Sequence, residues 1–307
     1  MAAAVILNLS DTTTTAINKK LNELREQVGA VTMGRVLTLI IAPQTGRLLD
    51  DSIVAANFAS QEHPSRMIVV MPGDPEATEA RLDAQLRTFG DAGAGEMVAL
   101  RLSGPLAAHA DSVVMPFLLP DIPVVAWWPD ISPAVPSSDP LGRLAIRRIT
   151  DATNAPDPLA AIRSRRDGHR PGDTDLSWSR ITYWRALLAS ALDQPPYEPI
   201  NSALVSGLST EPALDILAGW LASRIDGPVR RAVGELKIEL VRDSEIVTLS
   251  RPQDGVIATL SRTGRPDALL PLPRRDTAEC LAEDLRRLDQ DVIYGAALGG
   301  MERVEYQ

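Results

Sequence analysis

The first half of the chain alternates apolar runs with amphipathic segments, and this alternation restricts the fold more than any other feature of the sequence. Three runs, Arg35–Ala42, Arg66–Met71 and Ile122–Trp128, are almost continuously apolar, as strands buried on both faces require. A parallel strand pair needs a crossover connection, and the connections available here follow a helical pattern. We therefore predict an α/β fold with a mostly parallel, Rossmann-like sheet in the N-terminal half and helices on both faces.

Local signals predict the other elements of this half. Ile17, Leu21 and Leu24 recur at helical spacing, which predicts a helix that begins within Asp11–Thr15 and ends before Gly29. Alternating runs at 82–89 and 96–102 predict an added hairpin or edge strands. The remaining predictions are helices at about Leu48–Gln61 and Pro105–Met115 and a last strand at Ala145–Thr150.

The glycines of this half do not match a dinucleotide-binding site. The turn after the first predicted strand reads Ala42-Pro-Gln-Thr-Gly46, which lacks the close glycine pattern that lets a backbone approach a pyrophosphate. The glycines of Gly90–Gly95 have the wrong spacing and lie between two predicted strands. We expect a scaffold without a cofactor.

The second half has a different pattern. Prolines and glycines surround a short helical piece, Leu159–Arg165, which favours a solvated connector. The predicted division is an α/β domain at 1–153, a linker at 154–174 and an α+β domain at 175–307 with an antiparallel meander. Its predicted elements are strands at Ile200–Leu208, Leu236–Val241, Glu245–Ser250, Val256–Ser261 and Leu269–Leu272, and helices beginning at Thr210, Asp276 and Asp291.

Charge and cysteine content limit the partners and the compartment. A net charge of −9 argues against a nucleic acid or a membrane surface as partner, because both need a clustered positive field. No apolar run is long enough to span a membrane, and Met1–Leu9 lacks the basic flank of a secretory signal, so we expect a cytoplasmic protein. Cys280, the single cysteine, follows a capping box and is expected to be an inert, partly buried thiol.

The sequence offers little for catalysis. His63, His109 and His169 are the three histidines, and no two of them have the spacing of metal ligands. The chain also lacks a G-x-S-x-G nucleophile elbow. These observations favour a protein that is not an enzyme and holds no metal.

The segment Asp175–Arg185 is the densest aromatic and arginine cluster of the chain, with two of its five tryptophans. Asp175 or Ser177 can cap a helix that places Ile181, Trp184, Leu188 and Leu192 on one stripe. In such a helix Arg180 can stack on Trp184, while Trp178 and Arg185 share another face. Tryptophan and arginine often dominate protein interfaces, so an exposed member of the cluster is a docking candidate.

Together with His63-Pro-Ser-Arg66 and Pro123-Val-Val-Ala-Trp-Trp-Pro129, this segment resembles the OpcA family of glucose-6-phosphate dehydrogenase assembly proteins. The resemblance runs over nearly the whole chain. It implies a non-catalytic protein of the oxidative pentose phosphate pathway that binds glucose-6-phosphate dehydrogenase and promotes its active oligomeric state.

Two functional hypotheses follow. In the favoured one the chain is an assembly factor, and its partner-binding candidates are Asp175, Trp178, Arg180, Trp184, Arg185 and Trp128. In the alternative, the α/β domain binds a small molecule as a metabolite sensor or a weak enzyme. Its candidate ligand-binding residues are His63, Ser65 and Arg66, which could hold a phosphate or a carboxylate.

Overall fold

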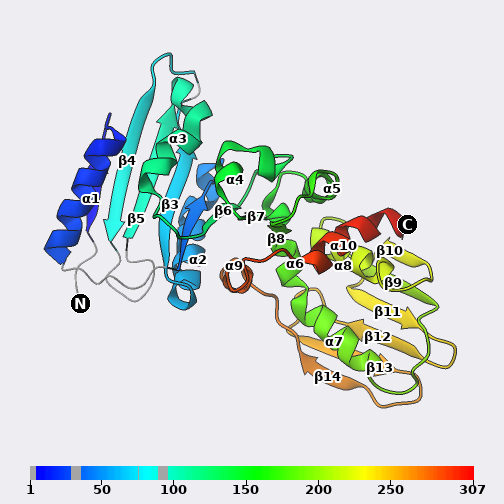
Figure 1. The fold of residues 1–307 in the computed structure, drawn as a ribbon. Coiled ribbons are helices and arrows are strands. Elements are labelled where there is room, and N and C mark those ends of the chain that lie inside the picture. The colour runs from blue at the N-terminus through cyan, green and yellow to red at the C-terminus, as the bar shows by residue number, and fades with distance from the viewer. Residues whose placement is uncertain (1–4, 29–35, 75, 89–95) are drawn as a thin grey trace.

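The computed structural model describes residues 5–28, 36–74, 76–88 and 96–307, which form two sheets with helical layers. The predicted Gly90–Gly95 loop lies outside the described residues. The first sheet is eight-stranded in the part described (Figure 1). In spatial order its strands are β1 (Ile6–Leu9), β4 (Arg81–Thr88), β5 (Glu96–Ser103), β3 (Ser65–Pro72), β2 (Leu37–Ile41), β6 (Val124–Trp128), β7 (Arg147–Thr150) and β8 (Asp173–Asp175).

The first sheet is mostly parallel, which confirms the predicted class. From β5 to β8 all neighbours are parallel, whereas β4 runs antiparallel to both β5 and β1. The predicted hairpin is therefore the pair β4 and β5. The strand at β7 was expected to be the last of the sheet, but β8 extends it by one more strand. This short polar strand gives no apolar signal in the sequence.

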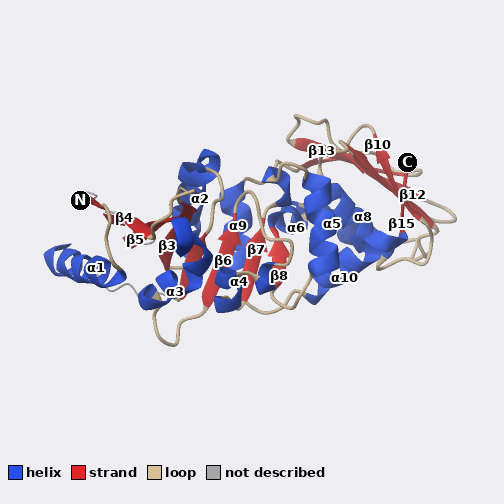
Figure 2. Ribbon diagram, turned by 90° about the horizontal axis from the view of Figure 1, so that it is seen from above, coloured by secondary structure: helices blue, strands red, loops and turns tan. Residues whose placement is uncertain are grey.

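Helices cover both faces of the first sheet (Figure 2). On one face lie α1 (Thr14–Val28), α3 (Ala110–Val114) and α4 (Pro140–Leu144), and on the other lie α2 (Leu49–Glu62) and α9 (Thr277–Leu285). The predicted helix at Pro105–Met115 is a 3-10 helix at Gly104–His109 that continues as α3. Trp127 and Trp128 point to opposite faces of the sheet, and both are core residues.

The segment predicted as a solvated connector is ordered secondary structure. It contains a short 3-10 helix at Ala152–Asn154, the helix α5 (Pro158–Gly168) and the strand β8. Ile162 is fully buried, and Arg165 is buried with bonds to the Ala134 carbonyl and the Ser132 hydroxyl. Gly172 has a φ of +89°, and a Cβ there would clash with the Ile146 carbonyl oxygen, so glycine is needed where β8 joins β7. The division into domains at these residues stays a prediction.

The second sheet contains the predicted meander. In spatial order its described strands are β14 (Ala268–Pro271), β13 (Ile257–Arg262), β12 (Ile246–Ser250), β11 (Lys237–Val241), β9 (Ser202–Gly207), β10 (Val229–Val233) and β15 (Val304–Tyr306). The run from β14 to β9 is antiparallel, whereas β10 is parallel to both β9 and β15. Sequence reasoning missed β10 and β15, because arginines and a glutamate interrupt their apolar pattern.

The second core lies between this sheet and the helices α5, α6 (Leu176–Arg180), α7 (Thr182–Leu192), α8 (Pro212–Ala222) and α10 (Val292–Gly300). The helix predicted to begin at Thr210 is α8, but Thr210 does not cap it, since the N-cap is Glu211 without a side-chain bond. The caps predicted for α9 and α10, Asp276 and Asp291, are both present.

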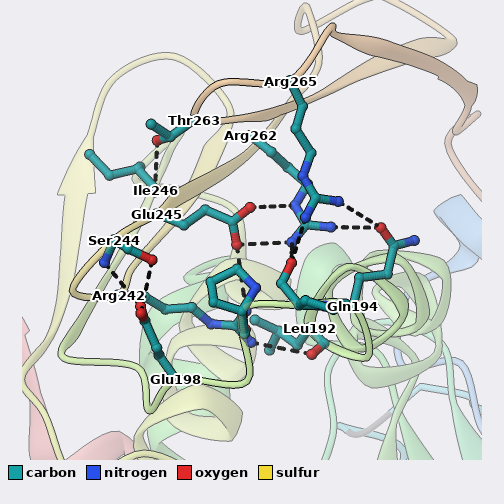
Figure 3. A network of polar contacts seen from close by, with 12 residues as sticks. Leu192, Gln194, Glu198, Arg242, Ser244, Glu245, Ile246, Arg262, Thr263 and Arg265 are labelled. Atoms are coloured by element: carbon teal, nitrogen blue, oxygen red, sulfur yellow. Dashed lines mark hydrogen bonds and ion pairs between the residues drawn. The ribbon is translucent and has the colours of Figure 1, made fainter.

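A buried ionic network fixes the loop after α7 to the second sheet (Figure 3). Glu245 accepts two hydrogen bonds from Arg262, at 2.7 and 2.9 Å, and one from Arg242 at 3.5 Å. Arg262 also donates to the Pro195 carbonyl, and Arg242 donates to the carbonyl oxygen of Leu192. Because one carboxylate orients both guanidinium groups, the network holds the end of α7 against the sheet.

Candidate functional site

The segment Asp175–Arg185 begins at the edge of the first sheet and ends in the second core. Asp175 closes β8 and caps α6 by accepting from the Ser177 backbone N–H at 2.9 Å, as predicted. The single predicted helix is two helices, because Ile181 leaves helical geometry with φ −98° and ψ 8°. It ends α6 and accepts the Arg185 backbone N–H in the first turn of α7.

Asp175 is completely buried, and both of its carboxylate oxygens are occupied. Besides Ser177, it accepts from the Thr150 hydroxyl at 2.6 Å and from the Ala152 backbone N–H at 3.0 Å. Thr150 is the last residue of β7, and Ala152 is the first residue of the 3-10 helix that follows it. The side chain therefore joins the edge of the first sheet to α6.

Trp178 is buried between three groups. Its indole Nε1 donates to Asp291 Oδ2 at 2.8 Å, while the other oxygen of Asp291 caps α10. The guanidinium carbon of Arg185 lies 3.4 Å from the centre of the indole ring, and the Tyr294 ring lies 5.9 Å away. Burial lowers the pKa of Arg185, and the negative charges of Asp291 and Glu283 partly offset this decrease. The cluster attaches α6 and α7 to α10.

Two acidic residues anchor α6 from its other side. Arg180 makes a two-pronged contact with the buried carboxylate of Asp151 at 2.8 and 2.9 Å. Burial alone would lower the pKa of Arg180, but the attraction of Asp151 and its hydrogen bonds outweigh burial and raise it. Asp284, on α9, accepts from Ser179 at 2.5 Å and from Arg147 of β7 at 2.6 Å. These contacts tie β7, α6 and α9 together.

The apolar side chains of the segment enter two different cores. Leu176 belongs to the core under α2 and α9 on the first sheet, whereas Trp178, only two residues later, belongs to the core of the second sheet. A second crossing occurs at α9, which follows the meander in sequence but packs Leu281 and Leu285 on the first sheet. Figure 1 shows α6 and α9 between the two sheets. We call residues 175–185 together with α9 the junction.

The predicted partner-binding residues are mostly interior. Trp128, Trp178 and Trp184 are 1%, 3% and 6% exposed, and Trp128 packs in the core on the face of the first sheet opposite α9. The predicted stacking of Arg180 on Trp184 is wrong, because Asp151 holds Arg180, and Arg251 instead lies 5.5 Å from the Trp184 ring. Direct docking through these three rings stays a prediction, and it would need exposure that this structure does not give them.

The structure does not bring the predicted ligand-binding residues to one open site. Ser65 bonds to Ser60 at 2.6 Å, and Arg66 donates to the Phe117 carbonyl and to Glu96. Adjacent residues of a strand point to opposite faces, so Ser65 and Arg66 lie on opposite sides of β3, which is an interior strand of the sheet. His63 lies 4.0 Å from the Glu62 carboxylate at the end of α2.

Sequence reasoning did not identify the acidic partners of the junction. Asp151, Asp284 and Asp291 receive the hydrogen bonds of Arg180, Ser179 and Trp178. The capping positions before α10 were visible in the sequence, but the contacts of Asp284 and Asp291 join residues more than a hundred positions apart. The spacing of residues within a short segment cannot predict a contact between such distant positions.

The described part of the chain contains no group of three or more His, Cys, Asp or Glu side chains placed to hold a metal ion. Nor does any helix within it combine the length and the apolar character needed to cross a bilayer. Burial raises the pKa of the Cys280 thiol to about 12, which fits the predicted inert role.

Family comparisons cover both halves of this arrangement. Residues 56–167 match the OpcA family described as the glucose-6-phosphate dehydrogenase subunit N-terminal domain, and residues 171–298 match the corresponding C-terminal domain. These matches define a two-part dehydrogenase assembly subunit. The chain belongs to the OpcA family.

Three oxidoreductases are among the solved structures to which the chain is similar. The Caulobacter crescentus aldose-aldose oxidoreductase is 13% identical, with 87% of this chain and 95% of that chain covered and a TM-score of 0.49. An oxidoreductase from Sinorhizobium meliloti is 9% identical (87% and 94% covered, TM-score 0.44). Glucose-6-phosphate 1-dehydrogenase from Mycobacterium avium is 12% identical (89% and 94% covered, TM-score 0.40). No curated protein matches the chain.

Proposed function

We propose that this chain binds glucose-6-phosphate dehydrogenase and promotes its active oligomeric state without catalysing a reaction itself. Membership of the OpcA family carries the proposal, because matches to both of its domains extend over most of the chain. Such a subunit raises the activity of its partner only as far as it binds the active state more tightly than other states. A cytoplasmic location accords with a single cysteine that is buried.

The junction supports a positioning role within this function. Leu176 and Trp178 anchor the same short segment in two cores, and both oxygens of the buried Asp175 accept hydrogen bonds from within the chain. We infer that the segment fixes one sheet relative to the other, so that surfaces from both halves reach the dehydrogenase together. Preorganisation of this kind lowers the entropic cost of binding.

Activation is tested by titrating the purified chain into the dehydrogenase of the same cell and measuring NADP reduction. We expect the rate to rise and saturate with increasing chain, and the chain alone to give no rate. Rates that do not change at micromolar concentrations of both proteins would contradict the assembly role. Turnover by the chain alone would instead support the enzyme alternative.

The positioning role is tested with two variants of the junction segment. Trp178→Phe removes the buried hydrogen bond to Asp291, whereas Tyr183→Ala changes a ring that is 48% exposed on the same segment. If the segment positions the two halves, Trp178→Phe weakens dehydrogenase binding more than Tyr183→Ala does. The reverse order would show that the exposed face of α7 contacts the partner directly.

A further inference from the structure

A trough in the described part of the first sheet lies beside α2. Arg81, Asp83, Gln85 and Arg87 occupy alternate positions of β4 and therefore share one face. The strand register places Arg101 of β5 opposite Asp83. This is the face that α2 covers further along the sheet, whereas α1 packs on the opposite face of β4 (Figure 2).

The floor of the trough changes from polar to apolar across the strands. Arg101 pairs with Met71 of β3, and Gln85 pairs with Ala99 of β5. Leu49 and Ile53 from the start of α2 complete the apolar side, and the cavity has a volume of about 460 Å³. That volume falls in the range of sites for small organic ligands, which is roughly 300–1,000 Å³.

The charge of the trough is opposite to that of the whole chain. Its lining includes three arginines and one aspartate, in a protein whose net charge is −9. The Asp83 carboxylate accepts hydrogen bonds from the Arg81 guanidinium and from the Asp11 backbone N–H, both at 2.9 Å. These bonds, the Asp11 one foremost, hold the pKa of Asp83 below its ordinary value. The lining therefore keeps an excess of positive charge.

Two guanidinium groups of the trough have no carboxylate partner within hydrogen-bond distance among the described residues. Arg87 donates to the neutral side chain of Gln85, and exposed Arg101 makes no hydrogen bond or ion pair in the described part of the chain. By contrast, Arg147 and Arg148 of the same sheet each pair with a buried aspartate. A guanidinium group without a carboxylate partner suits an anion, and phosphate oxygens match its planar fork.

We propose that this trough binds a small organic phosphate, with Arg87 and Arg101 holding the phosphate group and Met71, Ala99 and Ile53 contacting the less polar part of the molecule. This site goes beyond the assembly role and differs from the His63, Ser65 and Arg66 site of the sequence hypothesis. A dehydrogenase subunit with such a site would sense a phosphorylated metabolite through the first sheet.

Isothermal titration calorimetry on the full chain at low ionic strength tests the site. The probes are glucose 6-phosphate, pyrophosphate, citrate and uncharged glucose. The variant is Arg87→Gln/Arg101→Gln, with Arg101→Gln alone as a milder change. Arg230→Gln on β10 is the matched control, because Arg230 is also an exposed strand arginine without a hydrogen-bond partner among the residues described.

We expect saturable binding of at least one phosphate probe and none of glucose. The double variant should weaken binding at least about tenfold, and Arg230→Gln should leave it unchanged. Absence of saturable phosphate binding, or equal affinity in the double variant, would overturn the proposal. So would binding of citrate but not of phosphates. These titrations contain no dehydrogenase, so a negative result leaves the assembly role standing.

Discussion

At the scale of single residues, Trp178 shows how a motif that suggests docking can serve the interior. Its ring is buried, and its one polar atom donates to the carboxylate that also caps α10. The sequence predicted Asp175 as one of two possible caps and a shared helix face for Trp178 and Arg185, because both depend on neighbours within one or two helical turns. It could not predict Asp291, whose contact with Trp178 depends on the tertiary fold.

Replacement of Trp178 by Phe tests the importance of the indole hydrogen bond. The ring stays apolar and large, but Asp291 loses a donor, so we expect a loss of about 2 kcal/mol in the free energy of unfolding. Urea denaturation measures the change. Trp184→Phe is the matched control, because Trp184 is also buried but its indole N–H makes no hydrogen bond among the described residues. Equal losses in the two variants would refute the role of the bond.

Cys280 permits a second test at this scale. Burial raises the pKa of its thiol to about 12, so little thiolate is present at neutral pH. The packing of α9 on the first sheet also keeps the sulfur away from solvent. We expect an alkylating reagent to label native protein far more slowly than urea-unfolded protein at pH 8. Similar labelling rates in the two states would show that α9 opens readily from the first sheet.

At the scale of elements, strongly periodic apolar segments were predicted correctly, whereas short polar strands were missed. The buried strands β2, β3 and β6 and the capped helices α1 and α9 were predictable from their apolar spacing and caps. The strands β8 and β10 owe their place to pairing with a neighbouring strand, and their sequences, Asp-Thr-Asp and Val-Arg-Arg-Ala-Val, carry no alternation. The local sequence pattern indicates which face of a strand is buried, whereas the pairing of a short polar strand is decided by the rest of the sheet.

The Glu245 network offers a test of element packing. The hydrogen bond from Arg262 holds the pKa of Glu245 below its ordinary value of 4.5. A carboxylate with a lowered pKa contributes stability above pH 4.5, and that contribution is lost as pH falls through the folded-state pKa. Glu245→Gln should therefore cost about 3 kcal/mol at pH 7, with a smaller difference from wild type below about pH 4.

Thermal unfolding at several pH values measures this difference. Glu239→Gln on the same sheet is the control, because its pair with Lys237 is partly exposed and should contribute less than about 1 kcal/mol. A Glu245→Gln deficit that stays constant down to pH 3 would show that the glutamate acts by packing and not by charge.

At the scale of the whole molecule, the two sheets are coupled by two chain crossings. The segment after β8 enters the second core, and α9 returns from the meander to the first sheet. The OpcA resemblance, not periodicity, pointed to the function, because the motif residues carry no catalytic set and the family matches cover both halves. In the function we propose, this coupling lets the dehydrogenase bind both halves as one surface.

Size-exclusion chromatography with light scattering, on the chain mixed with its dehydrogenase, tests the assembly role most directly. We predict a co-eluting species whose mass accounts for both proteins and whose dehydrogenase activity per subunit exceeds that of the dehydrogenase alone. Separate peaks at micromolar concentrations, each with the mass and activity of the isolated protein, would contradict the account.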